Sequence, residues 1–150
     1  MRDAELVLRY FTFQRNWETF SGGMKRAMDS YMETNRSPND SVLLRMSDSF
    51  SKSLENVVAV FGEHSFQRWM PEKQEWRKHA LASLYDAQMF ALQDCNKDTL
   101  IAHKEEIMLQ FKDLFSDVGF RKSIDAATNT PALFKQRITV LRNLVNQIIN

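Results

Sequence analysis

Apolar positions along this chain recur at helical spacing, and the pattern predicts helices from end to end. The first predicted helix covers residues 3–13, with Asp3 as its N-cap. Its polar stripe is narrow and consists of Glu5, Arg9 and Thr12. A helix that is apolar on nearly all other sides is a buried helix. We therefore expect a partner surface or an upstream domain to cover its apolar residues, Leu6, Val7, Tyr10, Phe11 and Phe13.

The same spacing predicts several further helices, and the chain shows no strand with clean alternation. The predicted ranges are residues 23–34, 38–61, 76–92, 97–115 and 119–127, and a last helix that runs from residue 131 almost to residue 150. The second half of the 76–92 helix is apolar on most sides, which indicates a central position. The sequence thus predicts an all-α fold, a single compact bundle of about six to seven helices in which residues 1–150 form one domain.

Proline and glycine mark the expected helix boundaries. Ser37 is the expected N-cap of the 38–61 helix, with Pro38 at its first position and Gly62 as its stop. Pro71 interrupts any continuous helix through the stretch before residue 76. Pro131 suits the first position of the last helix.

Composition and charge narrow the class of protein. The chain has 150 residues, a 43% apolar share and a net charge of +1, which suits one globular domain without the basic excess of a general nucleic-acid binder. Cys95 is the single cysteine, so a reducing compartment fits. The sequence shows no membrane span and no secretory signal, which makes the cytoplasm the expected location.

The sequence carries no recognisable catalytic centre. His64, His79 and His103 stand apart from one another, without the spacing of a zinc site. Cys95 lies near a predicted helix C-terminus and is flanked by Asp94, which disfavours its thiolate. The phosphate-binding glycine loops and the nucleophile elbow are missing as well. We therefore expect no enzyme activity in this chain, no cofactor, no metal site and no small-molecule substrate.

One stretch interleaves basic residues with tryptophans. Its members are Arg68, Trp69, Lys73, Trp76, Arg77 and Lys78. Arginines beside aromatic rings can hold a nucleic-acid backbone and stack a base, so these residues form a candidate DNA contact. Tryptophans more often fill a core or anchor a protein interface, and Glu72 and Glu75 lie among the basic residues. Both interpretations stay open.

The last predicted helix carries three basic residues. Lys135 and Arg142 fall on its polar side, and this helix is a second candidate for a DNA contact. Arg137 instead falls inside the apolar face. A buried guanidinium needs a carboxylate or several carbonyls as partners, so we expect Arg137 to be a structural clamp.

Several segments, in order, resemble one known family. They are RDAELVLRYFTF, GGMKRAMDSYM, VFGEHSFQRW, ALASLYDAQMFAL, FKDLFSDVGFRKSI and TNTPALFKQRI. Over nearly its whole length the chain resembles the C-terminal helical region of the GmrSD-type modification-dependent restriction endonucleases, whose shared part is known as domain of unknown function 262. The resemblance implies a role in bacterial defence against phage. The family's nucleotide-handling domain, which resembles a ParB/sulfiredoxin-like fold, and its HNH-type nuclease domain have no counterpart in this chain.

Two functions follow from this resemblance and from the residues. In the first, the chain is a non-catalytic helical module that contacts an upstream nucleotide-binding domain or forms a homodimer. In the second, it is a DNA-contacting helical domain that uses the Arg68–Lys78 stretch or the last helix. The first helix favours the first function, because its apolar surface needs a cover.

Overall fold

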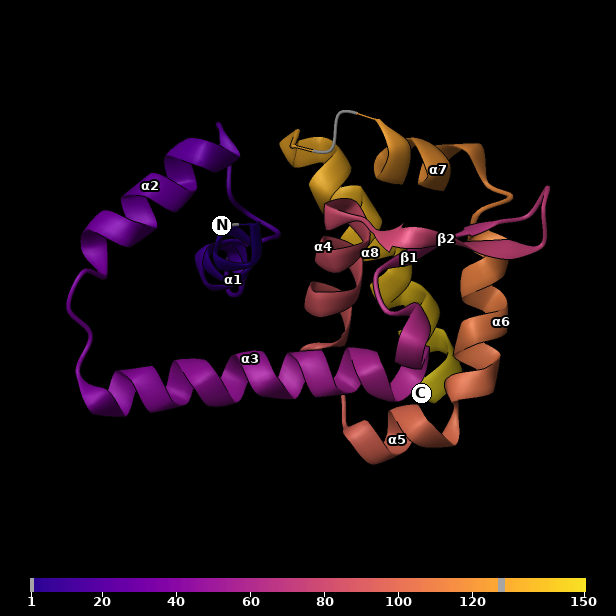
Figure 1. Cartoon of the computed structure of the whole chain (residues 1–150), viewed down its shortest axis with the longest axis horizontal. Coiled ribbons are helices and arrows are strands. Elements are labelled where there is room, and N and C mark those ends of the chain that lie inside the picture. Colours follow the sequence, from indigo (N-terminus) through magenta and orange to yellow (C-terminus); the bar gives the residue numbers. More distant parts are fainter. Residues whose placement is uncertain (1, 127–128) are drawn as a thin grey trace.

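The computed structural model describes residues 2–126 and 129–150, and it is mostly helical, as the sequence predicts (Figure 1). The described residues contain eight α-helices, one short 3-10 helix and one β-hairpin. The α-helices are α1 (Arg2–Phe13), α2 (Met24–Thr34), α3 (Asp40–Phe61), α4 (Ala82–Leu92), α5 (Lys97–Ala102), α6 (Lys104–Leu114), α7 (Val118–Asp125) and α8 (Pro131–Ile149). The 3-10 helix is Gly62–His64, and the strands are β1 (Gln67–Met70) and β2 (Glu75–Ala80).

The predicted end of α3 is confirmed, and its predicted start is wrong. The helix begins two residues later than expected, because the side chain of Asn39 accepts a hydrogen bond from the backbone N–H of Val42 and caps it. Ser37 and Pro38 therefore lie outside the helix. Gly62 ends it as predicted, at a φ of +53° that favours glycine.

The hairpin corrects the prediction that no strand is present and that a helix begins near residue 76. β1 and β2 pair antiparallel, with Trp69 opposite Trp76 and their rings edge to face at 5.2 Å. Cross-strand aromatic pairs stabilise antiparallel strands. The exposed residues of β2 are mostly charged, so apolar–polar alternation is too weak there to indicate a strand from sequence.

A second correction concerns the predicted helix over residues 97–115. It is broken at His103, whose backbone (φ −114°, ψ 10°) is not helical. The break leaves α5 and α6 as separate helices on either side of His103. Both pack against α3, so the chain turns around the end of that helix.

α4 lies at the centre of the molecule, as its composition predicts (Figure 1). Every residue from Ser83 to Leu92 is buried, with α8 on one side and α3 on another. α3 also satisfies backbone carbonyls of α4. Ser53 donates to the carbonyl of Met89 at 2.7 Å, and Asn56 donates to that of Leu92 at 2.8 Å. The central helix is therefore fixed by polar as well as apolar contacts.

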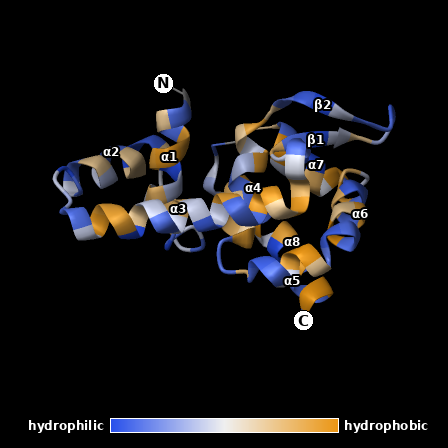
Figure 2. Cartoon of the chain, turned by 60° about the horizontal axis from the view of Figure 1, so that its bottom comes forward, coloured by the Kyte–Doolittle hydropathy of each residue, from blue (hydrophilic) through white to orange (hydrophobic). Residues whose placement is uncertain are grey.

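α2 and the first half of α3 extend away from this body and form an arm (Figures 1 and 2). Met24 is the buried residue of α2, and the buried residues of α3 begin only at Ser53. Leu43 and Leu44 are 48% and 66% exposed on the arm. Among residues 2–126 and 129–150, every helix is too short or too polar to cross a bilayer.

Candidate functional site

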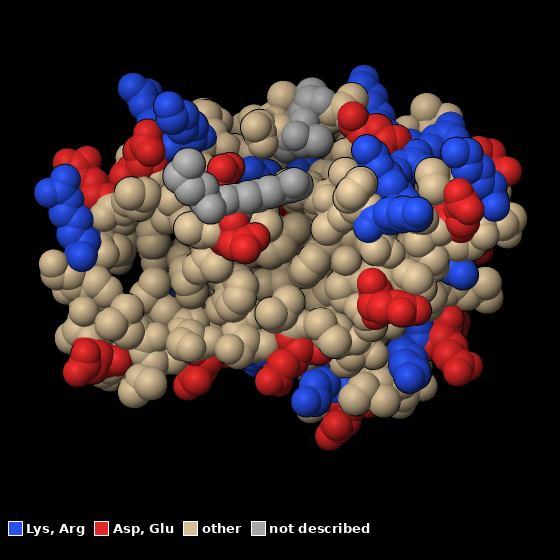
Figure 3. Space-filling view, in the orientation of Figure 1, with Lys and Arg blue, Asp and Glu red and all other residues tan. Residues whose placement is uncertain are grey.

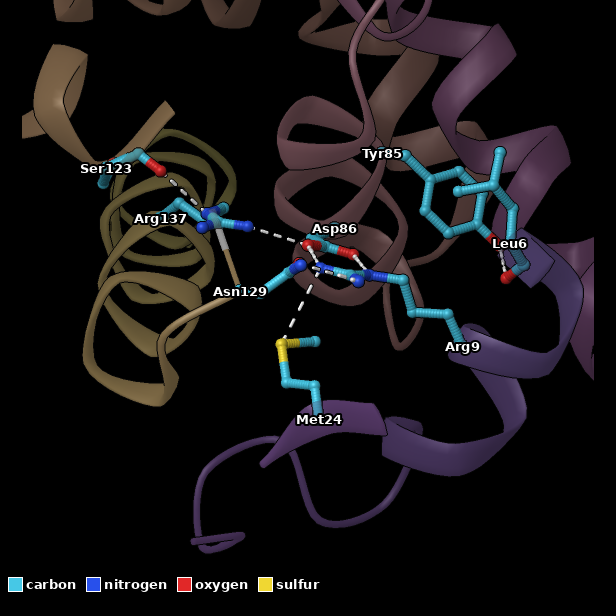
Figure 4. Close-up of polar contacts among 8 residues, drawn as sticks. All are labelled: Leu6, Arg9, Met24, Tyr85, Asp86, Ser123, Asn129 and Arg137. Atoms are coloured by element: carbon cyan, nitrogen blue, oxygen red, sulfur yellow. Dashed lines mark hydrogen bonds and ion pairs between the residues drawn. The ribbon is translucent and has the colours of Figure 1, made fainter. Parts of the chain in front are cut away.

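A buried charge cluster joins three helices at the centre of the fold (Figure 4). It consists of Arg9 on α1, Asp86 on α4 and Arg137 on α8. Arg9 binds the carboxylate of Asp86 in a bidentate manner, with Nε–Oδ1 and Nη2–Oδ2 distances of 2.6 and 2.5 Å. Arg137 donates from Nη1 to the same Oδ2 at 2.8 Å. One carboxylate thus holds two guanidinium groups that come from helices far apart in sequence.

Neighbouring groups satisfy further donors of the two arginines. Arg137 Nε donates to the backbone carbonyl of Ser123 at 2.9 Å, which ties α8 to α7. Arg9 donates to Asn129 Oδ1 at 3.4 Å and lies 3.9 Å from the sulfur of Met24 on α2. The cluster therefore links α1, α4, α7 and α8, and it reaches α2 through the sulfur of Met24.

The cluster is almost free of solvent. Asp86 and Arg137 are fully buried, and Arg9 is 5% exposed. Burial raises the pKa of the Asp86 carboxyl against the opposing effect of both guanidinium groups. Burial likewise lowers the pKa of Arg137, which Asp86 opposes. Each charge is therefore tolerated only because its partners are in place.

The sequence indicated one of the three members of the cluster. Arg137 is buried and paired, as its place in the apolar face predicts. The sequence placed Arg9 in the narrow polar stripe of α1 without a partner, and the structure shows that it is buried against Asp86. The available signal was Asp86 itself, since a carboxylate inside a helix that is apolar all round needs a buried cation.

The structure also corrects the predicted interface on α1. Tyr10 and Phe13 are fully buried in the chain's own core. Tyr10 stacks on Phe90 of α4 at 5.6 Å, and Phe13 packs on Phe134 of α8 at 5.2 Å. These two residues already have their cover, so no partner or upstream domain contacts them in this fold. Phe11 is half-buried and lines a hollow between α1, α2 and α3.

Leu6 and Val7 are the remaining part of that interface, and they line an apolar groove. The groove has a volume of about 470 Å³ and lies between α1, α3, the end of β2 and the start of α4. Its other apolar walls are Phe50, Leu54, Phe66, Ala80, Leu81, Ala82 and Tyr85. Asp3 and His79 are its charged or titratable residues. The groove will be called the α1 groove.

The tryptophans of the hairpin are enclosed by other side chains. Trp69 is 9% exposed, and the ammonium of Lys112 lies 4.1 Å from its ring centroid. Trp76 stacks against His64 at 4.6 Å, and Phe111 lies parallel to it at 6.3 Å. Trp69 therefore belongs to the core and is not free to stack a base, whereas Trp76 is half-buried and lines an open cleft.

The basic residues of the same stretch separate into two groups. Arg68 forms a bidentate pair with Asp125 of α7, with both N–O distances at 2.9 Å. Lys73, Arg77 and Lys78 are exposed, and within the described chain their side chains make no hydrogen bond or ion pair. These three residues line an open cleft of about 840 Å³ between the hairpin, the start of α4 and the end of α7. It will be called the hairpin cleft.

The basic residues of the last helix are engaged with aromatic rings. Lys135 lies 5.6 Å from the ring of Phe20, and Arg142 lies 5.7 Å from the ring of Trp17. Arg142 also approaches Glu18 at 3.8 Å. Both side chains fasten the loop after α1 to α8, which gives them a structural role on the polar side of this helix.

The isolated titratable residues do not converge. Cys95 is buried near the end of α4. Burial, and to a lesser extent the negative charge of Asp94, raises the pKa of its thiol. Within residues 2–126 and 129–150, no three His, Cys, Asp or Glu side chains gather as they would around a metal ion. His64 contacts Gln67, and His103 contacts the backbone of Thr99.

Comparison of the chain with models of known protein families, with curated proteins and with solved structures finds no match in any of the three.

Proposed function

We propose that this chain is a non-catalytic helical interaction module of a modification-dependent restriction protein, and that it works in the cytoplasm. The observation that carries the proposal is the α1 groove, in which Leu6 and Val7 remain accessible beside a well-packed core. The resemblance of the sequence segments to the GmrSD-type family supplies the restriction context.

The lining of the α1 groove favours a protein segment as its occupant. Small-molecule sites combine apolar walls with several convergent polar groups that fix the ligand's orientation. The α1 groove has Asp3 and His79 at its edge and otherwise apolar side chains. The core of a protein interface has the same character, because charged residues are depleted there. An apolar helix or strand of a partner protein is therefore the occupant that fits.

The test uses the tagged full chain in its native host and two matched variants. Val7→Glu places a charge in the α1 groove at a residue that is 36% exposed, so the core is unaffected. Leu44→Glu makes a similar change on the arm, at a residue that is 66% exposed and outside the groove. Quantitative mass spectrometry then compares the proteins recovered with each chain.

We expect a protein with a nucleotide-handling domain to co-purify with the parent and with Leu44→Glu, and to be lost with Val7→Glu. Recovery of that protein with all three chains would show that it binds elsewhere. Recovery of the chain alone, as a monomer by light scattering, would overturn the proposal.

A further inference from the structure

We infer that a cavity between the arm and the body of the molecule binds a small organic anion, one with a flat apolar body and a carboxylate or phosphate group. The cavity has a volume of about 450 Å³ and lies between the end of α1, the end of α2 and the start of α3. It will be called the arm cavity, and Figure 3 shows the surface hollowed there. This inference concerns a different surface from the α1 groove and does not depend on the proposed function.

The lining of the arm cavity is cationic. Arg15, in the loop after α1, and Arg45, on α3, are its charged residues, so the lining carries a net charge of +2. The hairpin cleft differs, because three carboxylates lie among its four cations. Burial raises the pKa of the Tyr31 phenol on α2, and the positive charge of Arg15 opposes this effect. The charge of Arg15 therefore acts on α2 as well as on its own loop.

Several hydrogen-bond donors of the lining have no acceptor in the part of the chain that the structure describes. Arg15 makes no hydrogen bond or ion pair there. Arg45 donates to the hydroxyl of Ser41 at 3.0 Å and forms no ion pair. The side-chain amide of Asn16 and the hydroxyl of Tyr31 are also without a hydrogen bond. Donors from the loop, α2 and α3 thus line one cavity, with no carboxylate among them.

Apolar side chains form the rest of the arm cavity's walls. Phe11 of α1 and Val42 and Met46 of α3 are half-buried, as is the ring of Tyr31. Small-molecule sites of about 300–1,000 Å³ combine apolar walls with a few polar groups that orient the ligand. A guanidinium binds a carboxylate or a phosphate through paired N–H donors. The lining therefore suits an anionic group attached to a flat apolar body.

The experiment is isothermal titration calorimetry of the full chain with three probes. They are 2-naphthoate, 2-naphthyl phosphate and the uncharged 2-naphthamide. The variant R15Q/R45Q removes both cations of the arm cavity. The control R26Q/R36Q removes two exposed arginines, one on α2 and one in the loop after it, which do not line the cavity. Equal urea midpoints for the three chains show that the fold is retained.

We expect both anions to bind the parent and the control with a Kd below about 1 mM, a value within reach of ligands of this size. R15Q/R45Q should bind them at least about tenfold more weakly, because charge-assisted hydrogen bonds are lost. The parent should bind 2-naphthamide at least about tenfold more weakly than 2-naphthoate for the same reason. The tighter of the two anions identifies the preferred charged group. Equal affinities of the variant and the control, equal affinities for 2-naphthoate and 2-naphthamide, or no binding by the parent would overturn the inference.

Hydrogen–deuterium exchange locates the bound anion. Met24 is the buried residue of α2, so this helix packs weakly on the body. An anion held by Arg15, Arg45 and Tyr31 links α2 to the loop after α1 and to α3. At about ten times its Kd, 2-naphthoate should slow exchange of the α2 amides by up to about tenfold in the parent, and should leave R15Q/R45Q much less protected. Protection confined to other helices would show that the anion binds elsewhere and would overturn the inference.

Discussion

Asp86 is a single carboxylate on which two buried guanidinium groups depend. Its Oδ2 atom accepts from Arg9 and from Arg137, and Oδ1 accepts from Arg9 again. Desolvating three charges is costly, and the geometry offsets that cost only while every partner is present. The pairs also span 77 and 51 residues of sequence, so they specify which helices meet.

We predict that Asp86→Asn lowers the free energy of unfolding by about 3–5 kcal/mol, because two buried cations lose their counter-ion. Urea denaturation followed by circular dichroism measures this change. The matched control is Asp125→Asn, which removes a bidentate partner of Arg68 at a side chain that is 40% exposed. We expect that control to cost less than about 1 kcal/mol.

A combined variant separates the cost of an unpaired charge from the value of the cluster. Replacing Arg9 and Arg137 by Met together with Asp86→Leu removes all three charges and keeps most of the volume. We expect its free energy of unfolding to exceed that of Asp86→Asn, since apolar replacements of whole buried ion clusters are often neutral or stabilising. A combined variant that is less stable than Asp86→Asn would contradict this account.

The buried thiol allows a prediction at the same scale. Because burial raises the pKa of Cys95, the folded chain keeps its proton at a pH where an unfolded thiol loses it. The thiolate fraction, and hence the labelling rate with a disulfide reagent near pH 8, should be at least about tenfold lower in buffer than in urea.

The same shift in the pKa of Cys95 has a consequence for stability. The folded chain binds more protons than the unfolded chain above the pKa of a free thiol, about 8.5, so the free energy of unfolding declines as the pH rises past that value. Equal labelling rates in buffer and urea would show that Cys95 is accessible in the fold.

Residue patterns predicted Arg137 well and Arg9 poorly, and the reason is physical. An arginine inside an apolar stripe is conspicuous on its own helix. Arg9 belongs to a stripe with Glu5 and Thr12 that is normal for a solvated face, and only the approach of Asp86 shows that Arg9 is buried. Contacts across 77 residues are not encoded in local periodicity.

At the scale of elements, the helices with a distinct apolar face are predictable and the hairpin is not. The bounds of α2 agree with the prediction within a residue. β2 has one half-buried residue, Trp76, and five exposed ones, so it owes its strand form to pairing with β1. The α1 groove and the hairpin cleft both border this hairpin. Because the sequence did not predict the hairpin, it could not predict how the residues of these two hollows come together.

The arm and the central helices should differ in local stability. α2 buries only Met24, whereas α4 buries every residue from Ser83 to Leu92. Local opening is easiest where few apolar contacts are lost. We predict that backbone amides of α2 exchange with deuterium at least about tenfold faster than those of α4 and α8, as measured by mass spectrometry of peptic fragments. Similar protection in α2 and α4 would mean that the arm is held more firmly than its packing indicates.

At the scale of the whole molecule, the α1 groove and the hairpin cleft lie next to each other. Leu81 and Ala82, at the start of α4, line both the α1 groove and the hairpin cleft. An apolar surface and a surface rich in charges of both signs thus share one border.

The position of α4 also has a consequence for synthesis on the ribosome. This helix needs α8 to cover it, and α8 begins at Pro131, about 40 residues after α4 ends at Leu92. At roughly 5–20 residues per second, about 2–8 seconds pass between the end of α4 and the start of α8, so the apolar α4 segment stays uncovered for at least that time. A chaperone that works on nascent chains should therefore engage residues 82–92, as well as α1, whose Phe13 also packs on α8, and release both when α8 arrives.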